Sequence, residues 1–332
     1  MRPRSAASGS AAARSAAHPP SLTGGESLDG ERAKVDWLTA TWKPDPDEHV
    51  AASVHAWFTD WLGGVMGESV SGLYGYESGV RFYVPYMGSA LFVGRVDFGG
   101  QHHGGRARLE LTGSGCTRVL HWHAVQRHLE QLQECTLTRV DLALDCLNGE
   151  FTVEDARDWY QAGEFNAGGR MPRVSSPGDW FAPEVRYGRT LEVGRRENGK
   201  MLRCYEKGRQ LGDQNSNWTR FEVELRNNDR DLPFDVLTRC DEYFVGAYRC
   251  LQRVLDAAAE KIRTHQKEGQ IAVEVMKTYA RDGYGQLLHV LRATGLSADD
   301  IVNELARPGV PRRLERASLG GFFNSGPPPL PH

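Results

Sequence analysis

The alternation of apolar and polar residues predicts a series of short strands in the first two thirds of the chain. Residues 34–42, K-V-D-W-L-T-A-T-W, alternate and carry β-branched and aromatic side chains, which is typical of a strand. Further strand patterns lie at 74–76, 81–87, 91–96, 106–111, 138–144 and 219–225. Because glycine-containing turns separate several of these segments, the pattern favours antiparallel pairing.

One hairpin has a specific turn signal. Residues 191–195 and 200–206 have strand patterns and flank the dipeptide Asn198-Gly199. This dipeptide tolerates the positive φ angles of a type I′ turn, so we expect a β-hairpin here.

Helical periodicity interrupts the strands and then replaces them. Residues 47–62 and 116–133 have helical patterns, and Thr152 with Asp155 forms a capping-box sequence that opens a helix through Tyr160. Beyond Pro233, helical patterns cover 243–263, 272–279, 284–294 and 297–306. The prediction is an α+β fold with a central, mainly antiparallel sheet and flanking helices, followed by a helical C-terminal region.

Composition divides the chain into parts. Of its 332 residues, 40% are hydrophobic and 25% are charged, which suits one large domain or two modest ones. The first 30 residues are rich in Ala, Ser, Gly and Pro and predict a disordered leader, with a transit peptide as the alternative. We therefore expect a leader at 1–30, a sheet domain at 31–232, a helical region at 233–318 and a second disordered tail at 319–332.

Charge and cysteine content restrict the compartment and the partners. No apolar run reaches the ~18 residues needed to cross a bilayer, so we expect no membrane-spanning segment. The six cysteines form no C-x-x-C pair and predict reduced thiols in a cytoplasmic protein. The net charge is −3, so any site for a polyanion must be local. Such a local site is indicated at 186–210, which holds eight cations and three acids.

Three of the predicted strands carry polar groups on one face, because side chains two residues apart on a strand point the same way. The three groups are Arg139, Asp141 and Asp145; Arg203, Tyr205 and Lys207; and Arg220, Glu222, Glu224 and Arg226. A polar sheet face is often only the solvated side, with ion pairs across it. Carboxylates beside a basic segment instead suggest a phosphate-backbone substrate and a divalent metal ion.

The segments T-R-V-D-L-A-L-D, G-K-M-L-R-C-Y-E-K-G-R-Q and R-F-E-V-E-L-R, in this order, resemble the replication initiation factor family. These are the rolling-circle initiators of filamentous phages and staphylococcal-type plasmids. The resemblance spans about Val35 to Leu314, and the C-terminal T-G-L-S-A-D-D-I-V-N-E-L-A-R-P-G-V-P-R-R-L resembles the phage branch more closely.

The resemblance implies that the domain at 31–232 nicks one strand of origin DNA, at a single-stranded or cruciform site, and later religates it. Tyr205 would be the nucleophile, would stay linked to the 5′ phosphate, and would leave a free 3′ hydroxyl as primer. A phenol is a poor nucleophile until it loses its proton, so it needs a neighbouring cation or base. We expect Lys207 to stabilise the phenolate or the charged transition state.

A metal ion and DNA contacts complete the expected site. Asp141, Glu222 and Glu224 are the expected ligands of Mg²⁺ or Mn²⁺, with Asp145 and Glu110 as further candidates. The expected DNA-binding residues are Arg195, Arg196, Lys200, Arg203 and Arg220. Trp37, Trp42 and Trp180 are either core residues or platforms for unpaired bases.

Other interpretations stay open. His121-Trp122-His123 has the form of a metal-binding pair, but its helical context disfavours ligation because residues two apart do not share a helix face. Two other functions fit the same polar strands. One is a metal nuclease that activates water, and the other is a noncatalytic DNA-binding regulator. A host helicase and a second copy of the chain are the expected protein partners. The helical C-terminal region is expected either to recognise duplex DNA or to form the contacts of the dimer.

Overall fold

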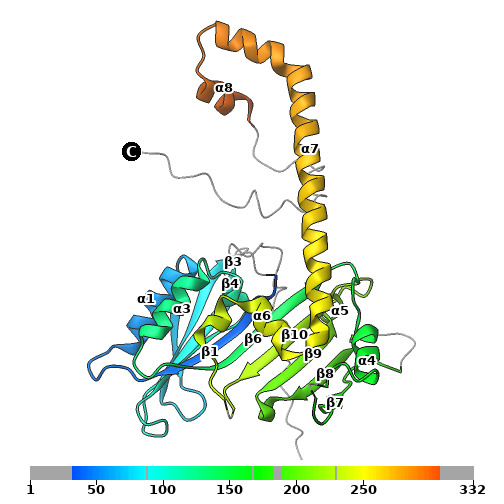
Figure 1. Ribbon diagram of the computed structural model, residues 1–332. Coiled ribbons are helices and arrows are strands. Elements are labelled where there is room, and N and C mark those ends of the chain that lie inside the picture. The colour runs from blue at the N-terminus through cyan, green and yellow to red at the C-terminus, as the bar shows by residue number, and fades with distance from the viewer. Residues whose placement is uncertain (1–31, 87–88, 167, 182–187, 229, 307–332) are drawn as a thin grey trace, which may run out of the picture.

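The computed structural model describes residues 32–86, 89–166, 168–181, 188–228 and 230–306 (Figure 1). The leader expected at 1–30 and the tail expected at 319–332 lie outside the described residues. In the described part of the chain, no helix has both the length and the apolar character needed to cross a membrane.

A ten-stranded sheet organises the molecule, and every pair of neighbouring strands in it is antiparallel. The strand order is β2-β3-β4-β5-β1-β6-β10-β9-β8-β7. The strands are β1 (Lys34–Trp42), β2 (Met66–Ser71), β3 (Ser78–Tyr86), β4 (Ser89–Phe98), β5 (Ala107–Leu111), β6 (Thr136–Cys146), β7 (Val174–Ser175), β8 (Thr190–Arg195), β9 (Lys200–Glu206) and β10 (Thr219–Arg226). The predicted α+β class with an antiparallel sheet is confirmed.

Most helices pack beside the sheet, but a long helix leaves it and a short one lies near the far end of that helix (Figure 1). The α-helices are α1 (Val50–Leu62), α2 (Gly113–Cys116), α3 (Trp122–Gln131), α4 (Val153–Gln161), α5 (Lys207–Gln210), α6 (Cys240–Ala247), α7 (Gln252–Ala293) and α8 (Ala298–Leu305). Short 3₁₀ turns are η1 (Arg196–Asn198), η2 (Phe234–Leu237) and η3 (Arg249–Leu251).

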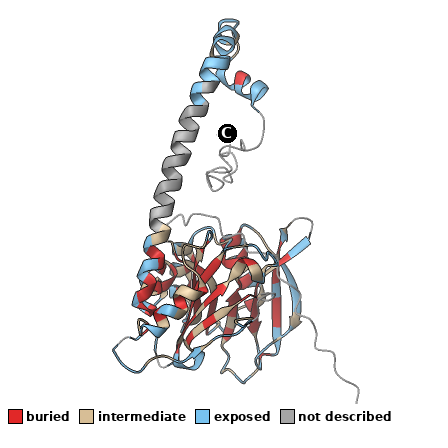
Figure 2. Cartoon of the chain, turned by 90° about the vertical axis from the view of Figure 1, so that its right-hand side faces the viewer, coloured by how far each residue is buried: buried red, intermediate tan, exposed pale blue. Residues whose placement is uncertain are grey.

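One face of the sheet holds the hydrophobic core. Alternate residues of the central strands, among them Leu38, Leu142 and Phe221, are buried together with Phe58 of α1 and Phe244 of α6. Burial of this apolar surface is the main force that stabilises the domain. Buried residues fill the sheet domain and the first turns of α7, whereas the described residues at the far end of α7 are mostly exposed (Figure 2).

The opposite face of the same strands is polar. Residues directly opposite each other on neighbouring strands share a face, so the register shows which side chains meet. Asp141 of β6 lies opposite Glu224 of β10, and Glu222 of β10 lies opposite Arg203 of β9. The three polar strand faces predicted from the sequence therefore lie side by side.

Some predicted elements differ from the observed ones. Residues 74–76 form a turn, and the edge strand is instead β2, whose residues are mostly exposed and therefore lack a clear apolar alternation. The β8–β9 hairpin is joined by η1, and only Gly199 has a positive φ, so the predicted type I′ turn is wrong. The sequence predicts three separate helices between residues 243 and 294, but most of this span is the single helix α7.

Candidate active site

Tyr205 lies near the end of β9, where it faces the polar side of the sheet. It is 9% exposed, and its hydroxyl donates a hydrogen bond of 2.9 Å to Glu222. Burial raises the pKa of Tyr205, and the negative charge of Glu222 raises it further. The phenol is therefore protonated at neutral pH, and Glu222 lies in position to accept its proton.

Glu222 receives hydrogen bonds and positive charge from its neighbours. Its second oxygen pairs with the guanidinium of Arg203. Burial alone would raise the pKa of Glu222, but the charges of Arg203 and Arg220 outweigh it and the net pKa is lowered. Glu222 is therefore ionised at neutral pH, as a proton acceptor must be.

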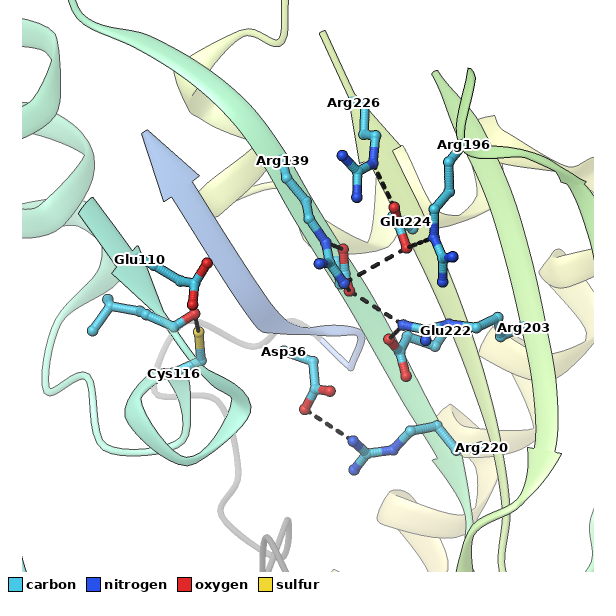
Figure 3. A network of polar contacts seen from close by, with 12 residues as sticks. Asp36, Glu110, Cys116, Arg139, Arg196, Arg203, Arg220, Glu222, Glu224 and Arg226 are labelled. Atoms are coloured by element: carbon cyan, nitrogen blue, oxygen red, sulfur yellow. Dashed lines mark hydrogen bonds and ion pairs between the residues drawn. The ribbon is translucent and has the colours of Figure 1, made fainter. Parts of the chain in front are cut away.

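Asp141 and Glu224 lie next to Glu222 and are fully buried. Arg139 donates to both oxygens of Asp141, at 2.9 and 2.6 Å. Burial is the main cause that raises the pKa of Asp141 to about 7, because the nearby Arg139 only partly opposes it. Glu224 accepts a hydrogen bond of 3.1 Å from Arg196 and pairs with Arg226 (Figure 3).

The predicted metal ligands are brought together, but they are already paired with arginines. Asp141, Glu222 and Glu224 each accept hydrogen bonds from guanidinium groups. Within the described residues, no three His, Cys, Asp or Glu side chains are arranged so that they could hold a metal ion. The observed donor set therefore does not fit a divalent cation, and Mg²⁺ or Mn²⁺ dependence stays a prediction.

Lys207 lies near Tyr205, as predicted, but it lies on a helix and not on the same strand. The strand ends at Glu206, and Lys207 is the first residue of α5, so it does not continue the strand face. Its ammonium nitrogen nevertheless lies 5.5 Å from the centroid of the Tyr205 ring. Burial lowers the pKa of Lys207, with a smaller contribution from Arg220 in the same direction.

Two of the predicted DNA-binding residues are committed to contacts within the protein. Arg220 is 1% exposed and bridges Asp36 at 2.9 Å and Asp145 at 2.8 Å, so its guanidinium is committed to the protein interior. Lys200 donates to the main-chain oxygen of Ala247 on α6. These placements differ from the prediction because a cation count along the chain does not show which side chain is buried.

Asp36 is a site residue that the sequence reasoning missed. The alternation of residues 34–42 was used only to predict a strand, although it also places an acid next to the strands of the site. Burial raises the pKa of Asp36, and Arg220 opposes this shift. Asp36 and Asp145 together hold Arg220, which lies opposite Tyr205 on the neighbouring strand (Figure 3 shows the Asp36 contact).

The remaining candidates occupy separate positions. Arg195 and Arg196 are exposed where β8 meets η1, and Arg203 is partly exposed beside Glu222. Glu110 pairs with Arg108 on β5. Trp42 is buried in the core, and the indole N–H of Trp180 donates to the Thr190 oxygen at 3.2 Å. His121 precedes α3 and His123 lies within it.

Removal of Arg220 is expected to destabilise the fold. Arg220→Ala leaves two partly buried carboxylates without their shared buried cation, and losing one member of such a group costs about 3–5 kcal/mol in free energy of unfolding. The control is Arg253→Ala, which removes an exposed pair with Glu164 and should cost less than about 1 kcal/mol. Denaturant unfolding measures both, and equal losses would contradict a structural role for Arg220.

A family model and a solved structure match parts of this chain. The family model described as replication initiation factor matches residues 135–306, which is just over half of the chain and includes β6, β9 and β10. A solved structure of a rolling circle replication initiator protein from Geobacillus stearothermophilus is similar, with 25% identity and a TM-score of 0.47, over 64% of this chain and 80% of that one. Among curated proteins, no match is found. The chain belongs to the replication initiation factor family, and its role is in the initiation of DNA replication.

Proposed function

We propose that this protein nicks one strand of origin DNA through Tyr205 and later religates it. The observation that carries the proposal is the 2.9 Å hydrogen bond from the Tyr205 hydroxyl to Glu222, on a sheet face lined with arginines. The family places the chain in replication initiation, and this bond provides a nucleophile with a proton acceptor in contact.

The proposed first step is attack of the Tyr205 oxygen on the phosphorus of the scissile phosphodiester. The phenol proton passes to Glu222, and the bond between phosphorus and the 3′ oxygen breaks. The products are a 5′-phosphotyrosine and a free 3′ hydroxyl, whose proton we assign to the Lys207 ammonium. Religation is the reverse of this sequence, with the 3′ hydroxyl as nucleophile.

Positive charge next to the phenol stabilises the negative charge that develops on the phosphate oxygens in the transition state. Arg203 pairs with Glu222 and is partly exposed, and its buried Nε has no hydrogen-bond partner among the described residues. An arginine with donor capacity left over can bind a phosphate oxygen and stabilise the transition state. The cation holding the phosphate is therefore an arginine of this chain, and the proposed steps use protein groups alone.

The test is incubation of the full chain with a single-stranded origin oligonucleotide carrying a 5′ or a 3′ label. The proposal predicts a protein-DNA adduct that survives denaturation and retains only the fragment downstream of the nick. A hydrolysed end without an adduct would favour the metal nuclease, and binding without any nick would favour the noncatalytic regulator.

The salt dependence of DNA affinity tests whether Arg195 and Arg196, where β8 meets η1, contact phosphates. Neutralising Arg195 and Arg196 together, both to Gln, is expected to reduce the slope of log affinity against log salt by about 1.4, since each lost single-strand phosphate contact contributes about 0.7. The control is Lys200→Gln, because Lys200 is bonded to α6 and should not alter the slope. An unchanged slope in the double variant would place the DNA elsewhere.

Several finer expectations remain proposals. We propose that a host helicase acts with this protein and that a second copy binds through the helical C-terminal region. We also propose cytoplasmic location and membership of the phage branch.

A further inference from the structure

We propose that a strip on the polar face of the sheet, next to the candidate active site, binds unpaired bases of the DNA strand that is nicked. The strip consists of Trp37 and Thr39 on β1, Arg108 on β5, Arg139 on β6, and Tyr74 in the turn between β2 and β3. The identity of the ligand as DNA rests on the proposed function, whereas the base-binding geometry does not.

The strand register places the strip on the same face as Tyr205. Trp37 lies opposite Asp141, and Thr39 lies opposite Arg139 on one side and Glu110 on the other. Four strand steps separate β9 from β5, which is about 19 Å at a spacing of about 4.8 Å. A single strand can span this distance, because single-strand-binding folds cover roughly 4–16 nucleotides.

Two aromatic rings in the strip are paired with arginines. The guanidinium carbon of Arg139 lies 4.8 Å from the Trp37 ring centroid, and that of Arg108 lies 4.8 Å from the Tyr74 ring centroid. Single-stranded nucleic acids are commonly bound by bases stacked on aromatic rings and on guanidinium planes. The two pairs therefore provide two stacking platforms of the same kind on one face.

Tyr74 is held in an exposed and unfavourable conformation. Its φ is +57°, which non-glycine residues rarely adopt, and it is 67% exposed. His103 contacts the main-chain oxygen of Tyr74 at 2.7 Å, and the Tyr76 ring stacks on His103 with centroids 4.1 Å apart. An exposed ring fixed in this way, at a position where glycine would be less strained, points to a function for the side chain.

The strip also contains two buried polar atoms without a partner among the described residues. The indole N–H of Trp37 and the hydroxyl of Thr39 are buried, and neither has a hydrogen-bond partner among the described residues. Thr39 is only 4% exposed. Buried polar atoms are normally satisfied, so these two indicate a ligand with hydrogen-bonding edges, as an unpaired base has.

The experiment measures equilibrium binding of a labelled single-stranded origin oligonucleotide to the full chain. Every protein carries Tyr205→Phe, so that no covalent step contributes. Tyr74→Gly is expected to weaken single-strand binding about tenfold or more, as loss of one stacked base does. The melting temperature is expected to stay equal or rise, because glycine accepts the positive φ. Binding to a duplex of the same sequence should change little.

Two further variants serve as controls. Tyr74→Phe keeps the ring and should keep the affinity. Tyr284→Ala removes a comparably exposed tyrosine, 64% exposed, from α7 and should not affect binding. Three results would each contradict the proposed strip. They are full single-strand affinity in Tyr74→Gly, an equal loss of affinity for the duplex, and a loss in Tyr74→Phe as large as in Tyr74→Gly.

The outcome separates this inference from the proposed function. If the unchanged chain forms no adduct but single-strand binding depends on the Tyr74 ring, the nicking proposal is wrong and the proposed base-binding strip holds. If the unchanged chain forms the adduct at residue 205, and Tyr74→Gly binds single-stranded DNA as tightly as the Tyr205→Phe protein does, the proposed base-binding strip is wrong and the nicking proposal holds.

Discussion

Tyr205→Phe is expected to abolish the covalent adduct with origin DNA. Phenylalanine keeps the ring on the polar face but has no oxygen to attack phosphorus, so no phosphotyrosine can form. Loss of the hydrogen bond to the ionised Glu222 should cost about 1.5–3 kcal/mol, which is less than the stability of a typical domain, about 5–15 kcal/mol, so the protein should stay folded. The measurement is the yield of labelled adduct on a denaturing gel.

The matched control is Tyr248→Phe. Tyr248 is also a buried tyrosine, and its hydroxyl donates to the Val193 oxygen at 3.0 Å. This variant loses a similar hydrogen bond on the apolar side of the sheet and should form the adduct at the normal level. Equal adduct yields from both variants would show that the phenol of residue 205 is not the nucleophile.

Glu222→Gln is expected to slow adduct formation by about 10²–10⁴-fold, the usual contribution of a positioned general base. The amide oxygen can still accept the Tyr205 hydrogen bond, but it cannot take the proton away. Single-strand affinity should not fall, because a negative charge is removed from a site that binds phosphate. The rate of adduct formation at saturating oligonucleotide measures this effect directly.

Glu224→Gln is the comparison that separates proton transfer from metal catalysis. Glu224 lies two residues away on the same strand face, is equally buried and is also paired with arginines, but it does not contact Tyr205. Proton transfer through Glu222 predicts a much smaller loss for Glu224→Gln. Losses of similar size in both variants, together with inactivation by a chelator, would instead support the predicted metal ligands.

The sheet domain and most of the site's strand faces could be predicted from the sequence. Strict alternation in β6, β9 and β10 fixes which side chains share a face, so Asp141, Glu222 and Tyr205 follow from the pattern once these strands are neighbours. Selection of Tyr205 among several tyrosines depended on the family resemblance, because alternation alone does not distinguish a nucleophile from a packing residue.

The rest of the site depends on contacts between distant segments. Asp36 and Asp145 hold Arg220 from two different strands, and local sequence gives no sign of this pairing. Strand periodicity also misplaces Lys207, because the chain leaves the sheet after Glu206 and turns the lysine toward the phenol through α5. Tyr74 was read as part of a strand, although its positive φ places it in a turn.

Peptide mapping of the covalent adduct tests the central claim most directly. The full chain would be reacted with a single-stranded origin oligonucleotide, digested with protease and nuclease, and the modified peptide sequenced by mass spectrometry. The account predicts one modified residue, Tyr205, carrying a 5′-linked nucleotide. Modification of another tyrosine, such as Tyr83 or Tyr160, or a nicked product with no modified peptide, would contradict it.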